Sequence, residues 1–122
     1  MLVPMLYILL AAANPTQKIA KVSASTCIKH RATYYEPGLE GKPMANRKPY
    51  NSHEYSAAFN KWPLGSLLKV TNMNDHTSIL VRVTDRKKTG WSIDLSRAAY
   101  NALGFSTKLG WGWVCLELVK EK

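Results

Sequence analysis

The chain has 122 residues, of which 46% are apolar, so it can bury the core of one domain and leaves no room for a second. Its formal charge of +9 favours an acidic or polyanionic partner, either a nucleic acid or an anionic cell-wall polymer. The Lys and Arg residues are spread along the whole chain without a zinc-finger, helix-turn-helix or RNP signature, so we expect no nucleic-acid partner. The three histidines lack metal-ligand spacing, and we therefore expect neither a metal ion nor a cofactor.

The N-terminus has the features of a signal peptide. Residues 2–13 form an apolar run too short to cross a membrane, and residues 11–13 (AAA) satisfy the small-x-small cleavage pattern. We expect residues 1–13 to be removed during export to the periplasm or the cell exterior, with no integral membrane association. Because no Lys or Arg precedes the run, a buried N-terminal strand or helix is the alternative. Residues 14–26 are small and polar, and we expect a flexible leader there.

The folded domain is expected to span residues 27–122. Residues 27–35 have strand character and end in a Glu-Pro-Gly turn. Residues 36–51 contain three of the six prolines and are expected to form a surface loop, whereas residues 56–59 (SAAF) form a short apolar strand.

The chain has two cysteines, Cys27 and Cys115, and they permit one disulfide. Export would make this bond chemically accessible, and it would close nearly the whole domain. Two buried free thiols are the alternative.

A β-hairpin is predicted in the middle of the chain. Residues 79–84 alternate with a period of two, the pattern of a half-buried strand, and Leu68 and Val70 begin a similar run. Between them, residues 72–75 (NMND) suit a turn, because Asn and Asp tolerate the left-handed region. The second strand runs directly into Asp85.

A helix is predicted over residues 97–103, with Ser96 as its N-cap and Gly104 just past its end. Residues 113–119 (WVCLELV) are predicted to form the last strand. Many short strands with one helix favour a mainly-β fold built as a small closed barrel.

Two acidic residues stand where predicted strands end. Asp85 ends the second hairpin strand, and Asp94 stands at the junction between a strand and the helix, two residues before Ser96. Asp85 could simply pair with Arg82 or Arg86, and Asp94 could help to start the helix, since acidic residues are common there.

Seven short motifs in order between residues 31 and 119 resemble the rare lipoprotein A family of septal lytic transglycosylases. That family shares its double-psi β-barrel with the first domain of expansins. The motifs are Ala32-Thr33-Tyr34-Tyr35, Lys42-Pro43-Met44-Ala45-Asn46, Ser56-Ala57-Ala58-Phe59, Leu64-Gly65-Ser66, Val70-Thr71-Asn72, Val81-Arg82-Val83-Thr84-Asp85-Arg86 and Ile93-Asp94-Leu95-Ser96-Arg97-Ala98-Ala99.

The resemblance implies an exported, monomeric, six-stranded double-psi β-barrel with one or two short helices, which binds peptidoglycan and in some members cleaves its glycan strands. It implies Asp94 as the catalytic acid, with Asp85 as its neighbour. Substrate binding would involve a groove and its rim, comprising Thr33, Tyr35, Arg86, Lys87, Lys88 and Trp91.

The reaction implied leaves a 1,6-anhydro end without using water. One carboxyl group protonates the leaving oxygen and then accepts a proton from the attacking sugar hydroxyl.

Several positions depart from the family pattern. Phe59 stands where the enzymes usually carry a histidine, and Lys48 and Asn51 stand at acidic positions. The Asp-Arg-Gly-Pro motif is replaced by Asp-Arg-Lys-Lys at residues 85–88. Two function classes therefore stay open, a lytic glycan-cleaving enzyme and a non-catalytic, expansin-like module that binds the cell wall.

Overall fold

The computed structural model describes residues 6–8, 20–22 and 27–121. Strands β1 (Leu6–Ile8) and β2 (Ala20–Val22) form a separate antiparallel pair. The rest of the predicted signal peptide and leader lies outside the described residues, so both stay predictions. No helix in the described ranges is long and apolar enough to cross a membrane.

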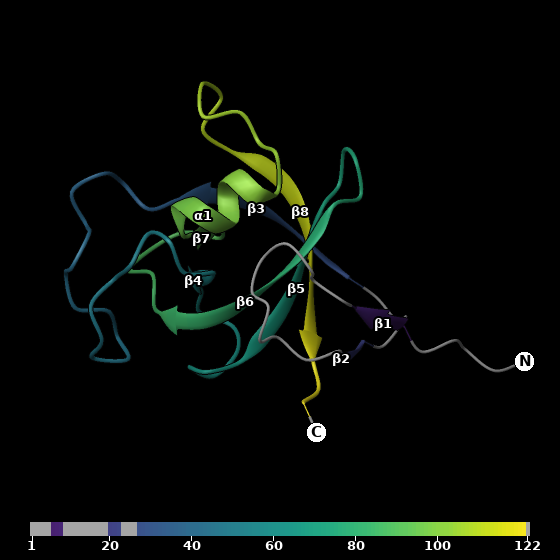
Figure 1. Cartoon of the computed structure of the whole chain (residues 1–122), viewed down its shortest axis with the longest axis horizontal. Helices are drawn as coiled ribbons and strands as arrows, with labels where there is room; N and C mark the ends of the chain where they lie inside the picture. Colours follow the sequence, from purple (N-terminus) through teal and green to yellow (C-terminus); the bar gives the residue numbers. More distant parts are fainter. Residues whose placement is uncertain (1–5, 9–19, 23–26, 122) are drawn as a thin grey trace, which may run out of the picture.

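Six further strands close into a barrel in the order β3-β7-β4-β6-β5-β8 (Figure 1). They are β3 (Ile28–Tyr34), β4 (Ser56–Ala58), β5 (Leu67–Asn72), β6 (Ser78–Asp85), β7 (Ile93–Leu95) and β8 (Gly112–Val119). The pairs β3/β7 and β4/β6 are parallel, and the other pairs are antiparallel. The predicted mainly-β fold, with a six-stranded barrel and one short helix, is confirmed.

The predicted hairpin is formed by β5 and β6. Ile79, Val81 and Val83 point into the core, as the alternation predicts. Leu80 lies on the opposite face of the strand, where a half-buried pattern predicts an exposed side chain, but it is buried as well. Lys69 lies directly opposite it in register, and the aliphatic stem of a lysine can cover an apolar neighbour.

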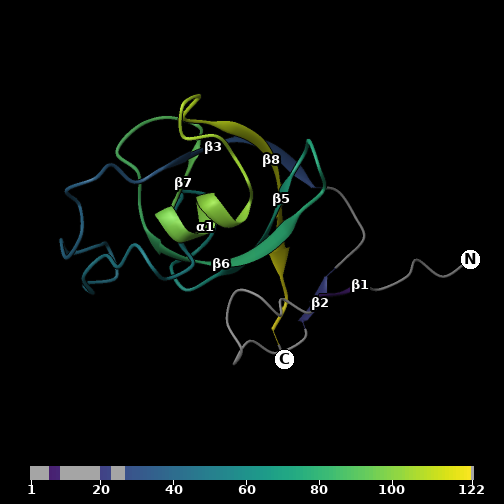
Figure 2. The same ribbon diagram turned by 45° about the horizontal axis from the view of Figure 1, so that its top comes forward.

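Helix α1 (Arg97–Ala102) begins where the sequence predicts, and Leu103 is its C-cap. The Ser96 hydroxyl accepts a hydrogen bond from the Ala99 amide at 3.3 Å and thereby caps the first turn. Figure 2 shows α1 lying over one end of the barrel. Its inner face buries Tyr100 completely in the core.

Strand β7 (Ile93–Leu95) is the barrel strand with the weakest signal in the sequence. Three residues are too few to show a period, so the sequence places Asp94 at the end of a strand before the helix without showing which strands that strand pairs with. In the structure β7 lies between β3 and β4 and closes that side of the barrel.

The 36–55 segment follows β3 as a long, ordered loop. Its base is held by Tyr35 and Tyr50, whose rings stack 4.2 Å apart, with Met44 packed in the same small cluster. This loop lies beside the ends of β3 and β6, and it forms part of the site described below.

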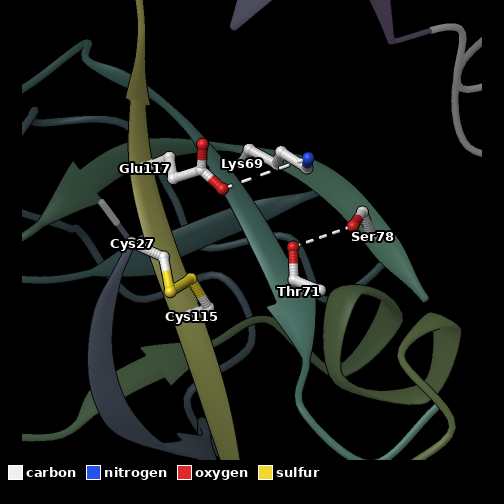
Figure 3. Close-up of a disulfide and its surroundings, with 6 residues drawn as sticks. All are labelled: Cys27, Lys69, Thr71, Ser78, Cys115 and Glu117. Carbon is white, nitrogen blue, oxygen red and sulfur yellow. Dashed lines mark hydrogen bonds and ion pairs between the residues drawn. A yellow bond between two sulfur atoms is a disulfide. The ribbon is translucent and has the colours of Figure 1, made fainter. Parts of the chain in front are cut away.

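Cys27 and Cys115 are joined by a disulfide (Figure 3). Cys27 immediately precedes β3, and Cys115 lies in the neighbouring strand β8. The bond therefore fixes the first barrel strand to the last one.

We expect a Cys27→Ser, Cys115→Ser variant to lower the free energy of unfolding by about 4 kcal/mol, because the bond closes a loop with a sequence separation of 88. Urea unfolding followed by circular dichroism measures this change. Cys27→Ser alone is the control and should lose as much as the double variant, since either removes the bond. An unchanged unfolding midpoint would show that the bond contributes nothing.

We also expect the fold to lose stability as the pH rises above about 10, the ordinary pKa of an exposed tyrosine. Burial raises the pKa of Tyr100, whose hydroxyl donates a hydrogen bond to the Ser106 carbonyl at 2.9 Å. The unfolded chain therefore releases this proton at a lower pH than the folded chain. Tyr100→Phe should make the free energy of unfolding fall less steeply between pH 9 and pH 11. An identical slope in the variant would contradict this assignment.

Candidate functional site

A row of four residues crosses four adjacent strands on the outer side of the barrel. Thr33 on β3 is paired in register with Asp94 on β7, and Ala58 on β4 is paired with both Asp94 and Asp85. Because side chains alternate along a strand, Asp94 points outward while its two neighbours on β7 are buried in the core. The row lies in a groove of about 460 Å³.

Asp94 has fewer hydrogen-bond donors from the protein on its carboxylate than Asp85 has. Its side chain is 31% exposed. Its Oδ1 atom accepts a hydrogen bond from the Thr33 hydroxyl and lies 3.1 Å from the Lys87 ammonium. Within residues 27–121, Asp94 Oδ2 makes no hydrogen bond to the protein, and Ser96, not Asp94, caps the helix.

Asp85 is held by several donors at the end of β6. Its Oδ1 accepts hydrogen bonds from the backbone amides of Ala45 and Arg86, both at 2.8 Å. Its Oδ2 accepts a hydrogen bond from the Tyr35 hydroxyl at 2.7 Å. Asp85 thus anchors the 36–55 loop to the barrel, and no ion pair with Arg82 or Arg86 is formed within the described residues.

Tyr35 is a fixed hydrogen-bond donor to the Asp85 carboxylate. Burial raises the pKa of Tyr35 strongly, and the hydrogen bond to Asp85 and the charges of Asp85 and Asp94 raise it further. Its hydroxyl therefore keeps its proton at neutral pH and holds the Asp85 carboxylate in place.

The three predicted rim cations do not behave alike. The Arg86 guanidinium donates to the carbonyls of Phe59 and Trp62, at 2.6 and 2.7 Å, and so braces the barrel end. The Lys87 ammonium reaches into the groove and bonds Asp94 and the Ser92 hydroxyl. Lys88 is exposed, and among the described residues it forms neither an ion pair, as Lys87 does, nor hydrogen bonds to carbonyls, as Arg86 does.

Trp91 stands beside the groove without lining it. Its side chain is 88% exposed, and its carbonyl accepts a hydrogen bond from His30 Nδ1 at 2.9 Å. The backbone is thus held while the ring projects into solvent.

The structure adds groove residues that the sequence analysis did not select. They are Tyr34, Glu36, Leu39, Ala58 and Thr89. Glu36 could have been found, because it follows β3 directly after the predicted Thr33 and Tyr35. Ala58 could not have been found from the sequence, because it carries no functional group and matters only as the small residue paired with both Asp94 and Asp85.

The positions that depart from the family pattern have structural roles. Phe59 is buried in the core, and its ring and that of His30 meet edge to face with their centres 5.1 Å apart. The Lys48 carbonyl accepts a hydrogen bond from the Met44 amide inside the loop. Across the described ranges, no three His, Cys, Asp or Glu side chains are grouped as a metal site would require.

Comparison with known proteins identifies the family to which the chain belongs. The lytic transglycolase family profile matches residues 28–115. A Synechocystis protein named "Probable endolytic peptidoglycan transglycosylase RlpA" is 37% identical over 91 residues, which are 73% of this chain and 28% of that protein. Endolytic peptidoglycan transglycosylase RlpA of Campylobacter jejuni is 40% identical over 70 residues, 56% of this chain and 26% of that protein. This chain thus spans about a quarter of these relatives.

Two solved structures share the fold at 21% identity. An aspartate-to-asparagine mutant of a Clavibacter michiganensis expansin, in complex with cellohexaose, superposes with a TM-score of 0.60 over 80% of this chain and 52% of that one. The Streptomyces papain inhibitor superposes with a TM-score of 0.58 over 78% of this chain and 97% of that one. The chain therefore belongs to the lytic transglycolase family and folds as an RlpA-like double-psi β-barrel.

Proposed function

We propose that the chain binds a peptidoglycan glycan strand in its groove and cleaves it by lytic transglycosylation. The observation that carries this proposal is Asp94, a half-buried carboxyl group that opens to the groove and is oriented by Thr33. The relatives named as endolytic peptidoglycan transglycosylases support the substrate class.

In the proposed reaction Asp94 donates a proton to the glycosidic oxygen as the bond from that oxygen to the sugar C1 breaks. The 6-hydroxyl of the same sugar then attacks C1 and gives its proton to the Asp94 carboxylate. The products are a free hydroxyl on one fragment and a 1,6-anhydro ring on the other, and no water is consumed. Oδ2 is the atom placed to carry the proton, because Oδ1 is already engaged by Thr33 and Lys87.

Asp85 has a different role in this proposal. Its oxygens are occupied by Tyr35 and two backbone amides, so it shapes the groove and supplies negative charge near the developing positive charge of the sugar. Trp91, exposed at the edge of the groove, offers a flat ring against which a sugar can pack.

The second candidate is a non-catalytic, expansin-like module that binds wall glycan. The observation that favours it is the Lys87 ammonium on Asp94, which must move aside before Asp94 can act as an acid. The substitutions at Phe59 and Lys48 favour it too, since family enzymes carry a histidine and an acid there.

We further propose that the chain works outside the cytoplasm and as a monomer. A disulfide between Cys27 and Cys115 suits an oxidising compartment. The monomeric state is what the resemblance to the family implies.

Asp94→Asn should reduce cleavage of purified peptidoglycan by about 100-fold or more, because the amide has nearly the same shape but cannot donate the proton as an acid. Mass spectrometry of the soluble products for anhydro-muropeptides measures the effect. Asp75→Asn is the matched control, since Asp75 lies in the β5–β6 turn and only accepts a hydrogen bond from the Thr77 amide.

Two results separate the candidate functions. If the unchanged protein releases anhydro-muropeptides and Asp94→Asn does not, the enzymatic function holds. If the unchanged protein sediments with peptidoglycan but releases none, the binding module is the function.

Lys88→Ala should weaken sedimentation with peptidoglycan about two- to threefold and reduce its salt dependence, since an exposed charge contributes roughly 0.5 kcal/mol. Lys87→Ala is the neighbouring control and should change binding less, because the Lys87 charge is already balanced by Asp94. Equal losses in both variants would mean that the Lys87–Asp94 pair opens when the strand binds.

A further inference from the structure

A second surface lies on the outer side of β3 and β8, next to the groove. We call it the β3–β8 face, and it consists of Lys29, Arg31, Trp111 and Trp113. Arg31 is paired in register with Trp113 across the two strands. Neither the groove nor the proposed reaction uses these four residues.

On this face each of the two cations lies over an indole ring. The Lys29 ammonium lies 4.4 Å from the centre of the Trp113 ring, and the Arg31 guanidinium lies 4.5 Å from that of Trp111. The two indole rings meet edge to face, 5.6 Å apart. Contacts of this kind hold long side chains in one place, so that binding costs less conformational entropy.

The two positive charges on this face are open to solvent. Lys29 and Arg31 are exposed, and within residues 27–121 neither forms a salt bridge. Trp113 is 39% exposed. The face therefore offers charge and apolar ring surface together, a combination that suits a polymer with both acidic groups and sugar rings.

The face is continuous with the groove along β3. Lys29, Arg31 and Thr33 are alternate residues of one strand, so they project from the same side of it. Thr33 bonds Asp94 in the groove, and Lys29 lies about 13 Å away at 3.3 Å per residue. A glycan strand that leaves the groove beside Thr33 would contact Arg31 first and Lys29 next.

We propose that the β3–β8 face is a second binding site, which holds the continuation of an acidic glycan strand whose other part occupies the groove. Arg31 and Lys29 pair with carboxylates carried by the strand, and the exposed ring of Trp113 packs against a sugar. This inference rests on the proposed function, because it takes the groove to be a glycan site. It adds that affinity increases with strand length beyond what the groove alone can hold.

The test compares two double variants that lose equal charge. Lys29→Gln, Arg31→Gln removes the cations of the face, whereas Lys61→Gln, Lys120→Gln removes two exposed lysines that lie outside it. Lys61 is a close control, since it also lies over a ring, that of Trp62 at 5.3 Å. The probes are a peptidoglycan tetrasaccharide, long glycan strands and double-stranded DNA.

We expect the face variant to bind long strands about tenfold more weakly than the control variant and to bind the tetrasaccharide equally well. Trp113→Ala should also weaken binding of long strands, with an unchanged salt dependence, because it removes ring surface and no charge. Equal binding of long strands by both double variants would overturn the inference while leaving the groove function intact. If the unchanged protein binds neither probe sugar, the proposed function fails as well. An equal loss on DNA would show a general polyanion surface and would also overturn the assignment to glycan.

Discussion

The site depends on the geometry of one three-residue strand. β7 pairs with β3 on one side and β4 on the other, so its residues cannot turn without breaking the barrel. Ile93 and Leu95 are completely buried, and the alternation of a strand then forces Asp94 to the outer face. The core thus fixes the direction of the Asp94 carboxyl group. A carboxyl group on a loop would need other contacts to hold it as firmly.

The two aspartates differ because the barrel surrounds them with different donors. Asp85 ends β6, where two backbone amides and Tyr35 converge on it, and its oxygens are satisfied inside the protein. Asp94 lies one strand away from Ala58, with a hydroxyl on one side and open groove on the other. Two equivalent residues in the sequence pattern therefore become an anchor and a candidate acid. Removing Asp85 would take away the acceptor of the Ala45 amide in the 36–55 loop, whereas removing Asp94 would take away the acceptor of the Thr33 hydroxyl in the groove.

The sequence predicts the hairpin, the helix and the closed barrel well, because alternation, an N-cap and a C-terminal glycine are local signals. It does not predict the strand partners of β7, which is too short to have a period, or the register that aligns Thr33, Asp94 and Ala58. The roles of the rim cations are also hidden from the sequence. In the sequence Arg86 and Lys87 look like free charges. In the structure Arg86 donates hydrogen bonds to two carbonyls, and Lys87 forms an ion pair with Asp94. Such partners are distant along the chain and depend on the fold.

The positive charges of the chain differ in how they are balanced in the groove and on the β3–β8 face. The groove is lined by three cations, Arg86, Lys87 and Lys88, and by three acids, Glu36, Asp85 and Asp94, so its net contribution to the attraction of an acidic polymer is small. The cations of the β3–β8 face lie on indole rings, which orient them without neutralising them. Attraction and chemistry would then be separated along β3, with the charges that capture the strand at Lys29 and Arg31 and the carboxyl that acts on it next to Thr33. The two cations of the β3–β8 face would then lie away from the carbon at which a cationic transition state would form.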